Sequence, residues 1–357
     1  MSIKLFTMLL LIGALATGFS LEPSVSKYII IQRMIINGKG IVDEEVFSRA
    51  FRLIPNIQGW QRLENATLLV NSKPASFMVK LDDDGNLFVY PGDLDFNGNL
   101  NITLMQVVDV VRPPFRRVAM MPEEIAQLSS FREELFKSPF WGCKYRDKNF
   151  SNILTLANNI QSQSVNTRDY VVKTAEWVYS NIKYKVSSSG GVQCPAETLY
   201  KGEGACADIH TLLTLLLRIQ GIDSYLAYAY VFTPGKSLTQ SLDKWSYLLV
   251  NVEPHVFSVV NSSGYLFPID VTANTGLNHK DIAENSAVNQ LDTVIVVGWI
   301  RNTTPDNFLA IFAPNGASKV MYSVEVRRVS ELYGDFIVLM LALAISAMLV
   351  IRKEEST

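Results

Sequence analysis

Runs of apolar residues divide the chain into a strand-rich first part and a more helical second part. Residues 28–36, 77–81, 87–90 and 100–111 are continuous or alternating apolar runs, and such runs predict strands. Asn37-Gly38 follows the first run and predicts a turn, and Asp82-Asp83-Asp84-Gly85-Asn86 predicts an exposed hairpin turn between the next two. We expect residues 21–121 to form a small antiparallel β-sandwich domain, which ends near Pro113-Pro114.

From residue 122 onward helical periodicity takes over. Pro122-Glu123-Glu124 predicts the opening of one helix, residues 167–182 predict a second, and residues 205–220 predict a third that Gly221 ends. Further apolar runs predict strands at 225–232, 247–252, 256–260, 265–269, 293–299 and 320–326. We expect residues 122–330 to form a second, α+β domain.

Both ends of the chain carry apolar segments of the kind that targets proteins to membranes. Residues 1–20 combine Lys4, an apolar stretch and small residues, which predicts a cleaved signal peptide or, alternatively, an uncut signal anchor. Residues 336–351 are apolar except for Ser346 and would extend roughly 24 Å as a helix. Arg352 and Lys353 follow at once. We therefore expect a transmembrane helix over 333–352, with the C-terminus inside and the main body outside the cell.

The composition is that of a folded protein with no affinity for nucleic acid. Hydrophobic residues make up 48% of the chain and charged residues 18%, so a large core is expected. The net charge is −2 and no basic stripe stands out, which argues against a nucleic-acid partner. Five Asn-x-Ser/Thr sequons fit an extracellular glycoprotein: Asn65, Asn101, Asn149, Asn261 and Asn302.

The chain holds three cysteines, Cys143, Cys194 and Cys206. In an exported protein Cys143 and Cys194 could form a disulfide and leave Cys206 as a thiol. The alternative is that all three are thiols, because sequence alone does not fix connectivity.

Cys206 stands where a predicted helix begins, directly after Gly204 and Ala205. The first turn of a helix presents unpaired N–H groups and a partial positive charge, and a nearby imidazolium adds to them, so a thiolate is stabilised there. His255 and Asp270 follow on two strand-like runs that a hairpin through Asn261-Ser262-Ser263-Gly264 would place side by side. The three residues thus suggest a nucleophile, a proton donor and a carboxylate that orients it.

Other readings of these residues stay open. Cys206 could be a buried apolar cysteine, and Asp270 could merely cap a turn at Thr272. His210, four residues after Cys206 on one helix face, is a rival base. The backbone N–H of Cys206 and the side chain of Gln193 are candidate oxyanion donors.

Metal sites are weaker alternatives. Cys206 and His210 with His255 or Cys194 could bind zinc, although no second close pair appears. Residues 93–101 resemble the start of a calcium loop, but Leu104 stands where an acid is needed, so a polar turn before a strand is favoured. We expect neither a metal nor a cofactor.

A family resemblance joins these observations. Pro195-Ala196-Glu197-Thr198-Leu199, the run from Gly202 to His210 and the run from Leu217 to Ile222 resemble the core of the transglutaminase-like superfamily. His255-Val256-Phe257 and Pro268-Ile269-Asp270-Val271-Thr272 resemble its histidine strand and its aspartate element. The match covers roughly residues 165–275. It implies a papain-like α+β fold, with a helix packed on an antiparallel sheet, in which Cys206 is the nucleophile, His255 the acid/base and Asp270 its orienting group. Residues 52–87 resemble more loosely the β-rich domain that precedes this core in some prokaryotic surface members.

The expected function is that of a membrane-anchored thiol enzyme outside the cytoplasm. It would attack a peptide or carboxamide carbonyl of a protein or peptide substrate and pass the acyl group to water or an amine. The alternative from another class is an inactive surface scaffold or adhesion protein that keeps the fold. A thiol oxidoreductase ranks last, because the chain has no Cys-x-x-Cys.

Overall fold

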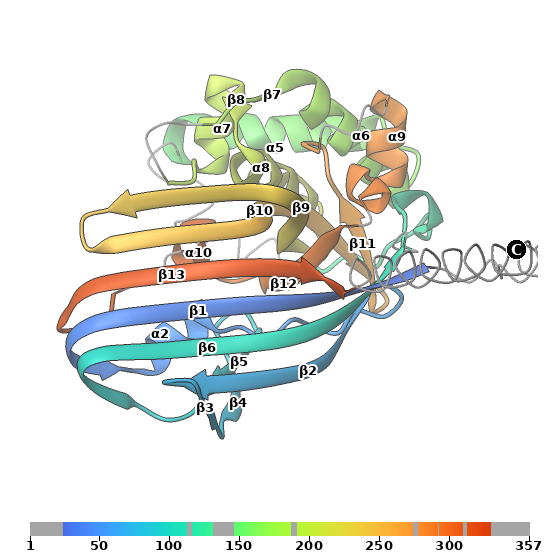
Figure 1. Cartoon of the computed structure of the whole chain (residues 1–357). Helices are drawn as coiled ribbons and strands as arrows, with labels where there is room; N and C mark the ends of the chain where they lie inside the picture. Colours follow the sequence, from blue (N-terminus) through green and yellow to red (C-terminus); the bar gives the residue numbers. More distant parts are fainter. Residues whose placement is uncertain are drawn as a thin grey trace, which may run out of the picture.

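The computed structural model describes residues 24–112, 116–130, 146–186, 191–273, 278–291, 293–309 and 313–329. Its centre is a nine-stranded sheet, and most helices gather against one end of that sheet (Figure 1). The strands follow the order β12 (Val294–Ile300), β9 (Ser224–Leu242), β10 (Trp245–Ser262), β13 (Ala317–Arg328), β1 (Ser24–Val42), β6 (Leu94–Arg112), β2 (Gln61–Val70) and β3 (Lys73–Ala75), and β11 (Tyr265–Ile269) pairs with β10.

Two short sheets complete the described strands. One is the hairpin of β4 (Met78–Leu81) and β5 (Leu87–Tyr90), which confirms the hairpin predicted around Asp82–Asn86. The other pairs β7 (Lys183–Tyr184) with β8 (Glu203–Gly204) in parallel.

The sheet does not divide at residue 121, where the sequence predicts the end of a separate β-sandwich. Strand β13 pairs in parallel with β10 on one side and antiparallel with β1 on the other, so it joins the two predicted domains in one mixed sheet. Their side chains also share a core: Tyr28 packs on Phe232 with ring centroids 5.4 Å apart, and Trp60 stacks on Phe257 at 6.0 Å. The expectation of a purely antiparallel sheet is also wrong, because β13 runs parallel to β10.

Strand β1 continues through the turn predicted at Asn37-Gly38. A β-bulge replaces the turn there, since the pairing with β13 shifts register between the two residues. Gly38 has φ +139°, and a Cβ at this position would lie 2.4 Å from the backbone oxygen of Gly316. The glycine is therefore explained by a close approach of two backbones and not by a chain reversal.

The helices are α2 (Glu44–Ala50), α5 (Arg146–Ser162), α6 (Thr167–Asn181), α7 (Pro195–Lys201), α8 (Cys206–Ile219), α9 (His279–Asn285) and α10 (Pro305–Leu309), with 3₁₀ turns at Val118–Met120 and Ala287–Gln290. The predicted helices over 167–182 and 205–220 are confirmed as α6 and α8. All residues of α8 after Cys206 are buried, because it lies between the sheet and the other helices (Figure 1).

No helix opens at Pro122: residues 122–128 are not helical, and residues 129 and 130 are the first helical ones after Pro122. Backbone groups of this segment bond to other parts of the chain: the Glu123 carbonyl accepts from the N–H of Arg168, and the Leu128 N–H donates to the Gly221 carbonyl. Bonds to neighbouring elements thus replace the bonds that a helix would have made within itself.

The residues of the candidate calcium loop are largely in a strand. Residues 94–101 belong to β6 and pair with β1, and the Asp93 carboxylate accepts the hydroxyl of Tyr90 at 2.6 Å. An extended, paired backbone cannot wrap around an ion.

The predicted signal peptide (1–20), the predicted transmembrane helix (333–352) and Cys143 lie outside the described residues. Within the described ranges, no helix has the length and apolar character needed to cross a bilayer.

Candidate active site

The start of helix α8 is built so that Cys206 is its first residue. The carboxylate of Asp208 accepts the backbone N–H of Ala205 at 2.8 Å and that of Gln193 at 2.7 Å, which caps the helix and ties it to the preceding loop. A Cβ at Gly204 would lie 2.6 Å from the Asp208 Cβ. The Gly-x-Cys-x-Asp spacing therefore has a packing reason: glycine leaves room for the capping carboxylate that fixes the position of Cys206.

The hairpin between β10 and β11 brings His255 and Asp270 together, as its sequence predicts. The turn uses left-handed backbone at Ser263 and Gly264, with φ values of 53° and 81°. The His255 Nε2 lies 2.6 Å from the Asp270 Oδ2, and the Asp270 side chain is fully buried. Residues 15 positions apart in the chain thus form a short hydrogen-bonded pair.

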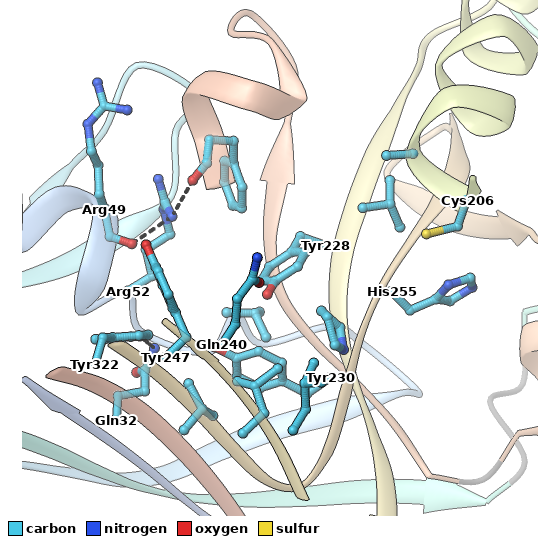
Figure 2. Close-up of a pocket in the computed structure, with 18 residues that line it drawn as sticks. Gln32, Arg49, Arg52, Cys206, Tyr228, Tyr230, Gln240, Tyr247, His255 and Tyr322 are labelled. Carbon is cyan, nitrogen blue, oxygen red and sulfur yellow. Dashed lines mark hydrogen bonds between the residues drawn. The ribbon is translucent and has the colours of Figure 1, made fainter. Parts of the chain in front are cut away.

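Cys206 and His255 border the same cavity, and Figure 2 shows the Cys206 sulfur near the imidazole ring of His255. Burial alone would lower the pKa of His255. The charge and hydrogen bond of Asp270, together with the interaction with Cys206, outweigh burial and raise the pKa of His255 to about 10. The ring is therefore an imidazolium at neutral pH, which is the partner that a thiolate needs.

Asp270 remains ionised despite its burial. Burial favours the protonated acid, but the charge of His255 and hydrogen bonds from His210 and His255 hold the pKa of Asp270 well below its ordinary range. Its Oδ1 also accepts the backbone N–H groups of Thr272 at 2.9 Å and Ala273 at 3.1 Å. The alternative that Asp270 caps a turn is thus correct as well, because one carboxylate oxygen caps the turn and the other faces His255.

His210 lies behind Asp270 and is fully buried, so it is not placed as a rival base. The backbone N–H of Ser258 donates to its Nδ1 at 3.1 Å, which assigns the ring proton to Nε2. The Nε2 then donates to the Asp270 Oδ1 at 3.2 Å. Burial lowers the pKa of His210 in spite of the nearby carboxylate, so the ring is neutral. The His255 and His210 rings therefore contact opposite oxygens of one carboxylate.

Gln193 does not serve as a free donor for an oxyanion. Its side-chain nitrogen donates to the Glu203 carbonyl at 3.3 Å and to the Asp208 Oδ2 at 3.2 Å. The amide therefore helps to hold the capping carboxylate. The backbone N–H of Cys206 lies in the first turn of α8, where N–H groups have no acceptor within the helix.

Two cavities meet at Cys206 and His255. The first has a volume of about 320 Å³ and extends toward Tyr228, Tyr230 and Tyr322. The second, of about 390 Å³, is bordered by Tyr184, Glu253 and Thr272 among others.

The sequence analysis did not single out Tyr184. The two-residue strand β7 carries no detectable pattern, and only its pairing with β8 places Tyr184 near Cys206. Burial first, and then the charge of Cys206, raises the pKa of Tyr184, which keeps the phenol protonated. A protonated phenol beside the cavity can donate a hydrogen bond to a substrate.

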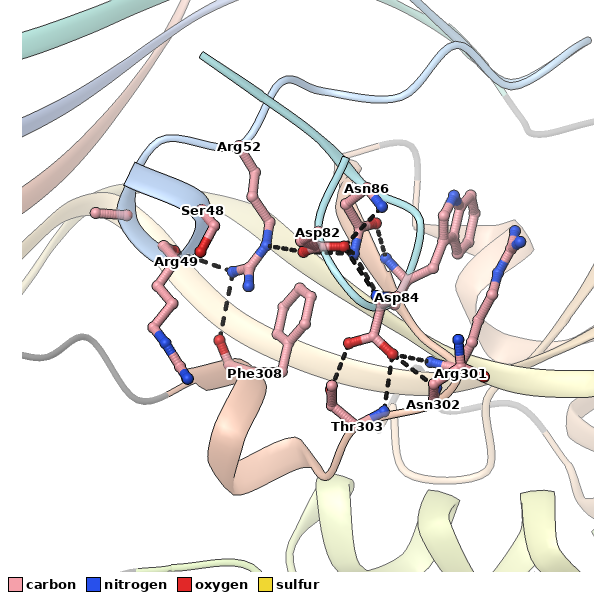
Figure 3. Close-up of polar contacts among 12 residues, drawn as sticks. Ser48, Arg49, Arg52, Asp82, Asp84, Asn86, Arg301, Asn302, Thr303 and Phe308 are labelled. Carbon is pink, nitrogen blue, oxygen red and sulfur yellow. Dashed lines mark hydrogen bonds and ion pairs between the residues drawn. The ribbon is translucent and has the colours of Figure 1, made fainter. Parts of the chain in front are cut away.

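The acidic turn after β4 was predicted to be solvated, but only Asp83 of its three aspartates is exposed. The Asp84 Oδ1 accepts the backbone N–H groups of Arg301, Asn302 and Thr303 at 2.7–2.9 Å (Figure 3). Asp82 pairs with Arg52 at 3.0 Å. These carboxylates hold the segment that leads into α10, whose Phe308 borders the first cavity.

Among the described residues no group of three or more His, Cys, Asp and Glu side chains could hold a metal ion. Cys194, one of the ligands in the zinc alternative, is buried. His210, another, uses both ring nitrogens for Ser258 and Asp270.

Comparison with known proteins identifies the part of the chain that carries this site. Residues 154–265 match the sequence model of the transglutaminase-like superfamily. The chain contains a transglutaminase-like core. That match includes Cys206 and His255 and ends before Asp270, and it leaves all of the strands β1–β6 outside.

A solved structure extends the likeness of fold beyond this core. A candidate cysteine protease from Cytophaga hutchinsonii aligns with a TM-score of 0.51 and 14% identity, over 87% of this chain and 92% of the other. The periplasmic domain of TgpA from Pseudomonas aeruginosa aligns at 12% identity with a TM-score of 0.31, over 72% of this chain and 90% of the other. No curated protein matches the chain. The first likeness shows a shared fold that includes the strands flanking the transglutaminase-like core.

Proposed function

We propose that this protein is a thiol acyl-transfer enzyme that acts on peptide or carboxamide groups through Cys206. One observation carries the proposal. The Cys206 thiol lies at a helix start beside an imidazole that a buried carboxylate keeps cationic, at the point where two cavities meet. A structural cysteine has no need of this arrangement.

The chemistry follows from the protonation states. The Cys206 sulfur, as thiolate, attacks the carbonyl carbon of the substrate, and the N–H of Cys206 is placed to donate to the oxygen that becomes negative. His255 gives its proton to the leaving nitrogen, the C–N bond breaks, and a thioester and a free amine result. Neutral His255 then takes a proton from water as the water oxygen attacks the thioester, and the acid and the thiolate are released. Water is the default acceptor, so we favour hydrolysis over crosslinking.

Asp270 holds the ring in the orientation that both steps need. Its Oδ2 is fixed on the His255 Nε2, which leaves the other ring nitrogen for the sulfur and the substrate. The carboxylate keeps its own position through the contacts of Oδ1 with Thr272, Ala273 and His210.

We place the enzyme outside the cytoplasm, anchored to the cell membrane by the apolar segment 333–352, with its main body extracellular after removal of residues 1–20. The sequence supports this placement through the basic residues that follow the apolar segment and the five sequons. A protein or peptide substrate in the same compartment is the expected partner.

The alternative function is an inactive scaffold that keeps the fold. The engagement of the Gln193 amide by Glu203 and Asp208 favours it, because a second oxyanion donor is then not supplied by that side chain. Loss of one such donor costs about 3 kcal/mol of transition-state stabilisation in well-studied hydrolases.

Thiol labelling separates the two functions. In the purified full-length chain we expect iodoacetamide to alkylate Cys206 at pH 6 at least about tenfold faster than an ordinary exposed thiol, because the imidazolium stabilises the thiolate. Substitution His255→Ala should remove this excess, and Cys206→Ser should abolish the modified peptide in mass spectrometry. Labelling at the ordinary rate, with no effect of His255→Ala, would favour the scaffold.

A further inference from the structure

The first cavity runs away from the reacting groups between the face of the large sheet and the segment around α10 (Figure 2). Ala207 and Val256, the neighbours of Cys206 and His255, border its mouth. Farther in, most of its walls are buried residues of several strands: Gln32, Tyr230, Val297, Tyr322 and Val324. The walls therefore come from both halves of the chain, beyond the part that matches the family.

Two buried polar side chains of this cavity, Gln32 and Tyr322, already have partners. The Tyr322 hydroxyl donates to the Ala50 carbonyl at 2.8 Å and accepts from the Gln32 amide at 3.2 Å. The Gln32 oxygen accepts from the amide of Gln106 at 3.0 Å. A ligand that enters therefore meets aromatic faces and aliphatic side chains more than open hydrogen-bonding groups.

The charges at the far end are also compensated. The Arg52 guanidinium is paired with Asp82 at 3.0 Å, and its Cζ lies 3.8 Å from the ring centre of Phe308. Arg49 is paired with Glu45 at 3.1 Å. A charged substrate group would lose its water here without gaining an uncommitted counter-charge, which disfavours it.

The two cavities differ in how enclosed their walls are. The second is bordered by exposed residues that do not border the first, such as Tyr184 and Glu253. An acyl group stays attached to the sulfur until water attacks, whereas the amine must leave first. The enclosed cavity therefore suits the acyl group, and the open one suits the exit of the amine and the entry of water.

An exposed leucine marks the rim between them. Leu238 borders both cavities and is 56% exposed on the outer part of the β9–β10 hairpin. Leu242, nearer the tip of the same hairpin, is 59% exposed and borders neither. A substrate that fills the first cavity would cover Leu238 and leave Leu242 in water.

We infer that the 320 Å³ cavity is the specificity pocket of the enzyme and takes an uncharged aromatic or branched aliphatic side chain from the residue that carries the scissile carbonyl. The inference rests on the proposed function, since it assigns the acyl group of that reaction to one of the two cavities. The volume lies at the lower end of the roughly 300–1,000 Å³ that small-molecule pockets span, so the cavity has room for one large side chain.

Chloromethyl ketones of N-acetyl amino acids test the inference in the full-length chain. The Cys206 sulfur bonds to the methylene carbon of the probe, the C–Cl bond breaks and chloride leaves, so no turnover is needed. We expect the phenylalanine and leucine probes, after correction for their rates with glutathione, to react at least about tenfold faster than the glycine probe. The aspartate and lysine probes should show no such gain.

Two sets of variants locate the preference. Val324→Phe places a ring in the cavity and should reduce the phenylalanine-to-glycine rate ratio toward one. Leu238→Ala should lower the ratio severalfold, whereas Leu242→Ala, on the same hairpin, should leave both rates unchanged. If Val324→Phe does not fold, as judged by its thermal unfolding, the two leucine variants decide.

The outcomes separate the two proposals. Equal corrected rates for all probes with the unaltered chain, a preference for charged probes, or equal effects of Leu238→Ala and Leu242→Ala would overturn the pocket assignment while Cys206 still reacts. Failure of every probe to modify Cys206 faster than an ordinary thiol would instead count against the proposed enzyme.

Discussion

At the scale of single residues, the site depends on one carboxylate that serves two histidines. The negative charge of Asp270 raises the pKa of His255, so this ring is cationic. His210 contacts the opposite oxygen, but burial lowers its pKa and the ring stays neutral. The same residue type therefore takes two protonation states within one cluster, with the ring centroids 6.4 Å apart. Environment decides between them, because desolvation and a charge partner act in opposite directions on an imidazolium.

The stability lost on replacement of the shared carboxylate should depend on pH. The pKa of His255 is raised from 6.5 to about 10, so its contribution is complete below about pH 6.5 and is lost as pH rises through about 10. The pKa of Asp270 is lowered, so its contribution is present above its ordinary 3.8 and is lost only in stronger acid. We expect Asp270→Asn to lower the free energy of unfolding by about 3 kcal/mol at pH 6.

At pH 10.5 the same substitution should lower the free energy of unfolding by less than at pH 6, because His255 is then neutral in the unaltered protein. Urea unfolding of both proteins at the two pH values measures the difference. A cost that stays equal at pH 6 and pH 10.5 would contradict an ionic pair.

His210 should act on the reaction through Asp270. His210→Leu removes the donor to the Asp270 Oδ1, so the carboxylate is held less firmly against His255. We expect alkylation of Cys206 at pH 6 to slow about tenfold, which corresponds to one hydrogen bond to a charged group. His210→Gln keeps an amide donor and should restore part of the rate. The pH profile of alkylation is the readout, since a general loss of packing would not displace it; unaltered profiles in both variants would rule out this role.

At the scale of elements, the site is held by polar contacts between segments that are distant in the chain. The turn between β4 and β5 supplies Asp84, which caps the backbone of residues 301–303. That loop leads into α10, and α10 supplies Phe308 to the cavity. A turn in the N-terminal part of the chain thus supports a wall of the candidate substrate pocket.

Removal of this carboxylate should loosen the loop. Asp84→Ala leaves three backbone N–H groups without their acceptor, and we expect a loss of about 3 kcal/mol in the free energy of unfolding. Asp83→Ala, one position earlier on an exposed side chain, is the matched control and should change stability by less than about 0.5 kcal/mol. Urea unfolding of the two variants makes the comparison, and equal costs would show that the contacts of Asp84 contribute little.

At the scale of the whole molecule, one sheet carries His255 and the strands that border the first cavity. His255 lies on β10, and the outer half of the same strand pairs with β13, which in turn pairs with β1. A substrate in the cavity would therefore contact strands from both halves of the chain. This continuity argues that the N-terminal strands belong to the same sheet as the candidate site and do not form a separate one.

The membrane anchor is tested on the whole chain. We expect deletion of residues 333–357 to move the protein from the membrane fraction to the soluble fraction, because the proposed spanning segment is then removed. Fractionation of cells that express the full-length and shortened chains, followed by immunoblotting, measures the change. Persistence of the shortened chain in the membrane fraction would contradict a single C-terminal anchor.

Local pattern in the sequence was sufficient for the elements nearest the chemistry. The apolar stripe and the end signals of α8, the hairpin of β10 and β11, and the hairpin around Asp82–Asn86 depend on residues that are close in the chain, and periodicity and turn chemistry report such contacts. The same locality let the spacing of His255 and Asp270 predict their hydrogen bond.

The contacts that join distant segments were decided by the tertiary structure alone. The residues near β13 in the sequence do not indicate that this strand lies between β10 and β1. The residues near Asp84 do not indicate that its carboxylate caps residues 301–303. The helical spacing of His210 and Cys206 suggested that His210 is a base. The sequence did not indicate that His210 contacts Asp270, because that carboxylate lies 60 residues away in the chain. Burial of charge and the pairing of strands are free energies of the whole fold, so local patterns carry little information about them.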